Sequence, residues 1–176
     1  RKNGHYLLSW EKRRSPDIFL EEASVTATEM GLILASNMAQ GKVLIEDAAS
    51  EPHVGDVANL LVKMGAKIDG IGSNRLLIQG EKSLSGVEHK IIPDCIDGGT
   101  FIIAAAITGG HVTIEDCPPD QYRLITAYLA SMGVDIEQKK GDIIEVKPSK
   151  LLAVRRKFQT RPWPGFPTDL MSPFIV

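Results

Sequence analysis

The sequence contains only two cysteines, Cys95 and Cys117, among 176 residues. Neither belongs to a C-x-x-C pair, so the sequence predicts neither a structural zinc site nor a disulfide framework. Few and unpaired cysteines are typical of proteins from a reducing compartment. We therefore expect a cytoplasmic protein.

The chain also lacks a long apolar run and a strong charge of either sign. No stretch approaches the roughly 20 apolar residues that a membrane-spanning helix needs, and the N-terminus has no signal-peptide pattern. The formal net charge of −2 argues against a general attraction to nucleic acid or anionic membranes. The content of 43% hydrophobic and 24% charged residues is typical of a globular protein. Because the chain opens on Arg1 and closes inside an apparent helix, we interpret it as a piece of a longer protein.

A repeated pattern organises the chain. The stretch VLIEDAASEPHVGDVANLLVKMGAKID, which begins at Val43, aligns with VTIEDCPPDQYRLITAYLASMGVDIE, which begins at Val112. Gly65 aligns with Gly133, and each glycine would end an amphipathic helix. A repeat of this length indicates a duplicated supersecondary unit.

Each repeat predicts the element order β-α-β-α-β-β. The predicted strands are 18–20, 42–46, 67–70 and 75–79, and then 90–92, 111–115, 135–138 and 143–146. The first helix of each unit is predicted over 26–39 and 99–107. The second helix carries apolar residues at helical spacing: Val54, Val57, Leu61 and Met64, and then Ile125, Leu129 and Met132.

We therefore predict an α/β (α+β) fold of two units. In each unit, helices would cover one face of a mixed four-stranded sheet. The turns GSN and KKG suit hairpins between the last two strands of each unit. The polar linker EKSLSGVEH, residues 81–89, is a natural seam between the units.

A polar corner precedes each first helix. Capping is the simplest interpretation of such corners, and Thr26 with Glu29 fits the capping box. Helix N-termini also attract anions, so several corners could converge on one anionic ligand. The glycine pair Gly98-Gly99 alone is too weak a signal to predict a phosphate-binding loop. The three corners are SVTATE from Ser24, PDCIDGGT from Pro93 and PTDLM from Pro167.

The third corner holds a carboxylate that three prolines precede. In RPWPGFPTDL, residues 161–170, each proline fixes its own φ and disfavours helix in the residue before it. The segment therefore cannot be a helix, and docking on the rest of the protein must order it. A helix cap needs no such bracing, whereas a general base must be held within hydrogen-bond reach of one proton. We interpret Asp169 as a candidate general base at the start of a truncated helix.

Ordered phrases along the whole chain resemble the UDP-N-acetylglucosamine enolpyruvyl transferase (1-carboxyvinyltransferase) family of the EPSP synthase superfamily. The phrases are ASVTAT, VLIEDAASEP, ANLLVKMGAKIDGIG, IIPDCIDGGTFIIAAAITGG and PWPGFPTDL. The resemblance implies an inside-out barrel fold of two lobes, each built from three β-α-β-α-β-β units around buried helices. It implies that residues 1–92 are the last unit of the first lobe. Residues 93–176 would be the first unit of the second lobe, running into a truncated next unit.

The implied reaction transfers the enolpyruvyl group of phosphoenolpyruvate to the 3-hydroxyl of UDP-N-acetylglucosamine and releases phosphate. It belongs to peptidoglycan and cell wall biosynthesis, which serves cell shape, the cell cycle and cell division. The resemblance implies no metal or organic cofactor. The implied partners are the two small-molecule substrates, with no nucleic acid, membrane or obligate protein partner.

The resemblance assigns site residues to two segments of this chain. The aspartate of the family's FPTD phrase, which approaches the sugar hydroxyl, corresponds to Asp169. The nucleotide-contacting segment corresponds to Ser24 and Val25, with Ala23, Glu22 and Thr26 beside them. Glu22 stands where many relatives have a lysine, and Thr26 stands where they have a glycine.

Other departures from the family pattern lie near these segments. Cys95 replaces an arginine, Met171 replaces a glutamine, and Trp163 stands where histidine or tyrosine is common. Trp163 could stack on uracil or simply pack between its prolines. The lid cysteine that acts as the family's general acid lies upstream of Arg1, and neither Cys95 nor Cys117 occupies its position. We therefore expect the chain to be inactive alone.

Two other functions stay open. The sister enzyme that acts on shikimate 3-phosphate has a similar fold, although the FPTD and SEP phrases favour the nucleotide-sugar branch. Four-stranded sheets of this kind also serve in non-catalytic nucleic-acid-binding modules, where aromatic side chains stack on bases. The predicted strands hold few aromatic residues and the net charge is negative, which argues against that class.

Overall fold

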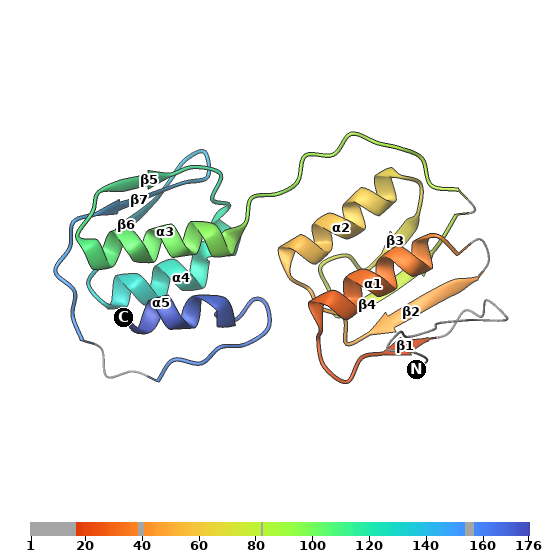
Figure 1. The fold of residues 1–176 in the computed structure, drawn as a ribbon, viewed down its shortest axis with the longest axis horizontal. Helices are drawn as coiled ribbons and strands as arrows, with labels where there is room; N and C mark the ends of the chain where they lie inside the picture. The colour runs from red at the N-terminus through yellow and green to blue at the C-terminus, as the bar shows by residue number, and fades with distance from the viewer. Residues whose placement is uncertain (1–16, 39–40, 82, 154–156) are drawn as a thin grey trace, which may run out of the picture. The chain divides into compact units, whose positions relative to one another are not determined.

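The computed structural model describes residues 17–38, 41–81, 83–153 and 157–176. These residues form two compact units, drawn in Figure 1 from red at the N-terminus to blue at the C-terminus. The first unit comprises the described residues up to Ala49 together with Val57–His89. The second unit comprises Ser50–Asp56 and Lys90–Val176.

The first unit is built on a four-stranded mixed sheet of order β1-β2-β4-β3. Its strands are β1 (Ile18–Phe19), β2 (Lys42–Glu46), β3 (Lys67–Asp69) and β4 (Arg75–Gln79). Strand β1 runs parallel to β2, and β4 is antiparallel to both β2 and β3. Alternation along the two central strands buries one face, which includes Val43, Ile45, Leu76 and Ile78.

Helix α1 (Val25–Ser36) packs against β2 and β4. The contact is close, because a Cβ at Gly31 would lie 2.8 Å from Cδ1 of Ile45. Helix α2 (Pro52–Lys63) buries Val54, Ala58 and Leu61. Its first residues, up to Asp56, are grouped with the second unit.

The second unit contains a three-stranded antiparallel sheet of order β5-β7-β6. The strands are β5 (Val112–Ile114), β6 (Asp135–Lys139) and β7 (Ile143–Lys147). Helices α3 (Cys95–Thr108) and α4 (Pro119–Ser131) pack against this sheet, and the short α5 (Met171–Ile175) packs against α3 (Figure 1). The buried core includes Ile102, Tyr122, Ile125, Ile144, Val146, Phe166 and Leu170.

The predicted duplication is confirmed in the backbone. Asp47 and Asp116, which follow β2 and β5, both have a φ of 57°. The ends of α2 and α4 close in the same way, since Ala66 donates to Leu61 O at 3.0 Å and Val134 donates to Leu129 O at 3.1 Å. The last two strands of each unit form antiparallel hairpins, as the turn residues predict. The repeat in sequence is therefore a repeat of local structure.

The predicted strand over 90–92 is wrong. These residues form no strand, and Ile91 is 77% exposed. The reason is the position of α3, which starts at Cys95 rather than at the predicted residue 99. Asp94 caps this helix by accepting the N–H of Ile96 at 2.8 Å, so the chain turns into the helix directly after Pro93. The second sheet consequently has three described strands instead of the predicted four.

Helix α1 carries apolar side chains on more than one face. Leu32 and Ala35 are buried, whereas Met30, Ile33 and Leu34 are each more than half exposed. A helix that is apolar on all sides is normally buried, so part of α1 is left uncovered by the described residues. Despite such surfaces, none of the helices in the described part of the chain has the length and apolarity needed to cross a membrane.

Candidate functional site

The corner before α1 is a preorganised helix start. Ser24 is the N-cap, with extended backbone angles, and its Oγ accepts the N–H of Ala27 at 3.3 Å. The predicted capping box of Thr26 and Glu29 is therefore wrong, because the helix begins two residues earlier than that pattern requires. The Thr26 hydroxyl instead lies 3.4 Å from the Ser24 hydroxyl. At the other end α1 stops at Ser36, and the last residue of the predicted helix, Ala39, lies outside the described residues.

Thr28 fixes this corner from beneath, and sequence reasoning missed it. Its side chain is fully buried and donates to Ser24 O at 2.7 Å. The same hydroxyl accepts the N–H of Ala49 at 2.9 Å. Thr28 thus ties the start of α1 to the loop after β2. The only sequence signal for it is a polar residue on the buried stripe of an otherwise apolar helix.

An open hollow of about 550 Å³ lies at this corner, lined by Leu20, Glu21, Glu22, Ser24 and Ala27. Two predicted site residues, Glu22 and Ser24, therefore line one concave surface. The other three, Ala23, Val25 and Thr26, are their chain neighbours, and Thr26 is exposed. The surface combines a helix N-terminus, which favours anions, with two carboxylates, which oppose them. Nucleotide binding at this hollow stays a prediction.

The segment before Asp169, which we call the strap (residues 160–167), is ordered by docking, as its prolines predict. Thr160 and Phe166 form a parallel bridge, and the N–H of Arg161 donates to Phe166 O at 3.1 Å. At the tip, the N–H of Gly165 donates to Pro162 O at 2.8 Å. The strap is therefore a closed loop whose base is hydrogen-bonded.

Aromatic packing anchors both ends of the strap. Phe166 is 1% exposed, and its ring centroid lies 5.5 Å from that of Tyr128 and 4.9 Å from that of Phe174. Phe158, just before the strap, lies 5.0 Å from each of these two rings. Such aromatic contacts contribute about 0.5–1.5 kcal/mol per pair beyond area burial. The loop is held to the core of the second unit on either side of its tip.

Asp169 lies in a 3-10 turn, Thr168–Leu170, that leads directly into α5. The N-cap of this turn is Pro167, so Asp169 lies within the turn and does not cap it. Leu170 is fully buried, whereas Asp169 beside it is exposed. The buried Leu170 anchors the backbone of the turn directly beside an exposed carboxylate. This arrangement suits a general base, and the catalytic role stays a prediction.

The glycine pair of α3 supports this turn and does not form a loop. Gly98 and Gly99 lie inside the helix and are buried. A Cβ at Gly98 would collide with the Tyr122 hydroxyl, and a Cβ at Gly99 would lie 2.6 Å from Cδ1 of Leu170. The pair therefore lets α4 and the Asp169 turn approach α3 closely. This packing explains the glycines without a phosphate ligand.

The two cysteines have the character of structural thiols. Cys117 is buried and Cys95, the first residue of α3, is half-buried. Burial raises the pKa of both thiols, and the charge of Asp94 raises that of Cys95 further. A raised pKa disfavours the reactive thiolate. In the described residues, no group of three or more His, Cys, Asp or Glu side chains is placed to hold a metal ion.

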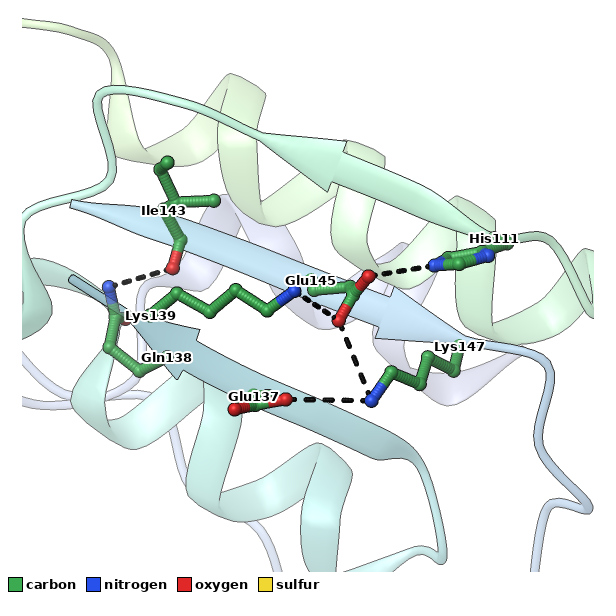
Figure 2. Close-up of polar contacts among 7 residues, drawn as sticks. All are labelled: His111, Glu137, Gln138, Lys139, Ile143, Glu145 and Lys147. Atoms are coloured by element: carbon green, nitrogen blue, oxygen red, sulfur yellow. Dashed lines mark hydrogen bonds and ion pairs between the residues drawn. The ribbon is translucent and has the colours of Figure 1, made fainter. Parts of the chain in front are cut away.

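The open face of the second sheet carries a charge network around Glu145 (Figure 2). Its carboxylate lies 2.6 Å from Lys139 Nζ, 3.0 Å from His111 Nε2 and 3.5 Å from Lys147 Nζ. Hydrogen bonds from Lys139 and then His111 lower the pKa of Glu145 to about 2. The three strands hold no aromatic residue, so this face lacks the stacking surface of a nucleic-acid-binding sheet.

Close relatives of the chain are curated as UDP-N-acetylglucosamine 1-carboxyvinyltransferases. The protein from Halothermothrix orenii is 44% identical over 94% of this chain and 39% of its own length. That from Borrelia garinii subsp. bavariensis is 42% identical over 99% of this chain and 42% of its own length. A third, from Geobacillus kaustophilus, is 44% identical over 99% and 40%. The chain thus spans about two fifths of the length of these relatives.

A solved structure shares the fold. The enolpyruvyl transferase NikO from Streptomyces tendae superposes with a TM-score of 0.65 at 22% identity, over 85% of this chain and 36% of its own. The family model described as EPSP synthase (3-phosphoshikimate 1-carboxyvinyltransferase) matches residues 8–176. The α/β fold of repeated units is therefore confirmed, and the chain belongs to the EPSP synthase family.

Proposed function

We propose that this chain is part of an enzyme that transfers the enolpyruvyl group of phosphoenolpyruvate to the 3-hydroxyl of UDP-N-acetylglucosamine. The observation that carries the proposal is the 42–44% identity, along nearly the whole chain, to three proteins named for that activity. The role would belong to peptidoglycan biosynthesis in the cytoplasm. Residues 1–92 and 93–176 would be the adjoining units of the two lobes.

In this proposal Asp169 is the general base. The reaction forms a bond between the sugar oxygen and C2 of phosphoenolpyruvate, and it breaks the bond between C2 and the phosphate oxygen. The sugar hydroxyl loses its proton as the bond forms, and an ionised carboxylate can accept it. Asp169 is exposed next to the buried Leu170, which restricts its movement. The general acid and the remaining substrate contacts would come from the rest of the protein.

The hollow at Ser24 would take the nucleotide part of UDP-N-acetylglucosamine. The N-terminus of α1 supplies partial positive charge, and the Ser24 backbone is fixed by its cap and by Thr28. Glu22 would reduce the affinity of this surface for a diphosphate. Ala23, Val25 and Thr26 would complete the contact segment.

A chimaera tests the proposal, with this sequence replacing the matching segment of the Halothermothrix orenii relative. Phosphate release that depends on both substrates is expected.

Asp169→Asn in this chimaera should lower kcat by roughly 10²- to 10⁴-fold, as loss of a general base typically does. Asp135→Asn, an exposed aspartate of β6, is the matched control and should leave kcat unchanged. An Asp169→Asn variant within twofold of the parent would reject the base. Turnover of shikimate 3-phosphate in place of the nucleotide sugar would reject the proposed acceptor.

A further inference from the structure

Glu51 is fixed at the start of α2, in the segment that belongs to the second unit. Its carbonyl oxygen accepts the N–H of Gly55 at 3.1 Å, which is the first hydrogen bond of the helix. Pro52, the first helical residue, restricts the backbone at this point. A carboxylate here is also favoured by the helix dipole. The side chain of Glu51 therefore extends from a rigid base.

The two oxygens of the Glu51 carboxylate have different surroundings. Oε1 accepts the backbone N–H of Trp163 at 3.4 Å. Oε2 is buried and has no hydrogen-bond partner among the residues that the structure describes. A buried, unpartnered carboxylate oxygen opposes folding, so a purely structural side chain would be better placed elsewhere. Within the described part of the chain, the only hydrogen bond of this carboxylate joins Oε1 to the Trp163 N–H.

That bond reaches the one available donor at the tip of the strap. In Pro162-Trp163-Pro164 neither proline has an N–H, so the Trp163 amide is the sole backbone donor of the three residues. The base of the strap is held by the Arg161–Phe166 hydrogen bond. Glu51 therefore holds the tip of a loop whose base is already fixed.

We propose that Glu51 is a positioning residue for Asp169. The strap continues through Pro167 into the Thr168–Leu170 turn, and Pro167 leaves little backbone freedom between Phe166 and that turn. Fixing the strap at base and tip thus fixes where the Asp169 turn begins. The inference rests on the proposed function only in naming Asp169 as the base. The mechanical link between Glu51 and the strap does not depend on it.

Amide hydrogen exchange of the chain itself tests the link. Glu51→Ala should speed exchange at Trp163 and Gly165 by about tenfold or more, the change expected when a hydrogen bond to a charged group is lost. Glu51→Gln retains an acceptor oxygen and should stay within about threefold of the parent. Glu46→Ala, which removes an exposed ion pair with Arg75, is the control and should leave the strap unchanged.

Glu51→Asp separates positioning from helix capping. Aspartate keeps the charge and is a preferred residue at a helix N-terminus, but it is one methylene too short to reach Trp163. We expect Glu51→Asp to speed amide exchange at Trp163 and Gly165 as much as Glu51→Ala does. Circular dichroism should show that the chain stays folded. Exchange at the parent rate in Glu51→Asp would overturn the inference.

The chimaera adds a catalytic measurement. Glu51→Asp should lower kcat by about tenfold with KM for UDP-N-acetylglucosamine within twofold, and Glu51→Gln should recover most of the loss. Faster exchange in the strap of Glu51→Asp, together with an Asp169→Asn substitution that leaves kcat unchanged, would support the link between Glu51 and the strap. The same result would reject Asp169 as the base. Unchanged kcat in Glu51→Asp, in a chimaera where Asp169→Asn is impaired, would overturn the positioning role.

Discussion

Leu170 occupies the space that a side chain on Gly99 would need, since a Cβ there would lie 2.6 Å from Leu170 Cδ1. Leu170 is fully buried and directly follows Asp169. The position of the candidate base therefore depends on the absence of a side chain in the middle of α3.

Gly99→Ala should destabilise the chain by about 1–3 kcal/mol, the range for overpacking a filled core. Urea denaturation of the isolated chain measures this change. Gly86→Ala in the linker is the matched control, because a Cβ there meets nothing within 4 Å. Equal stability of the two variants would show that Leu170 moves aside without loss.

The Glu145 network predicts a stability change in acid. The folded pKa of Glu145 is about 2, below its ordinary 4.5, so its contribution is fully present above pH 4.5. It is lost as the pH falls from 4.5 towards 2, because the carboxyl then protonates and releases Lys139 and His111. Glu145→Gln should therefore show a shallower decline in the free energy of unfolding over that window. Urea denaturation at several pH values between 5 and 2 measures the slope.

Glu137→Gln is the control for this prediction. Glu137 contacts Lys147 at 3.5 Å, and its side chain is 55% exposed, against 13% for Glu145. Exposed ion pairs of this kind contribute little. The slope of Glu137→Gln should match that of the parent chain. A Glu145→Gln slope equal to both would mean that the network does not stabilise the fold.

The carboxylate of Glu22 should weaken nucleotide binding, and replacing it with a cation should strengthen binding. It lines the same hollow as Ser24, so its carboxylate would repel a diphosphate bound there. Glu22→Lys in the chimaera should lower KM for UDP-N-acetylglucosamine by about three- to tenfold at low salt, with kcat unchanged. The gain should shrink at 0.5 M salt, where exposed charges are screened. Glu88→Lys in the linker makes the same charge change elsewhere, and an equal effect there would exclude a local role for Glu22.

Two strands with alternating burial, β2 and β4, could be predicted to the residue. The limits of β2 and β4 match their predictions, because each strand buries every second residue against the helices. The start of α3 was misplaced because glycine is a poor helix former, and no local pattern reveals the Tyr122 and Leu170 side chains that need the space at Gly98 and Gly99. Local helix propensity does not predict the start of α3, because tertiary packing requires glycine at these two positions.

In the candidate site, too, local features could be predicted from the sequence and long-range contacts could not. Proline content alone predicted that the segment before Asp169 is ordered by docking, and the buried Phe166 confirms it. Nothing local indicates that Glu51 bonds to Trp163, since 112 positions separate the two residues. The capping box was misread because Thr26 and Glu29 fit the pattern, whereas Ser24 already had the extended backbone that a cap requires.

The residues with left-handed backbone conformation after β2 and β5 allow the two units of the molecule to be compared with each other. Asp47 and Asp116 have the same φ in two units of different sequence. If the same substitution changes the free energy of unfolding equally at Asp47 and Asp116, the change reflects the conformation of the turn and not its surroundings. Any difference between the two stability changes measures what the surrounding residues add, so each unit serves as an internal reference for the other.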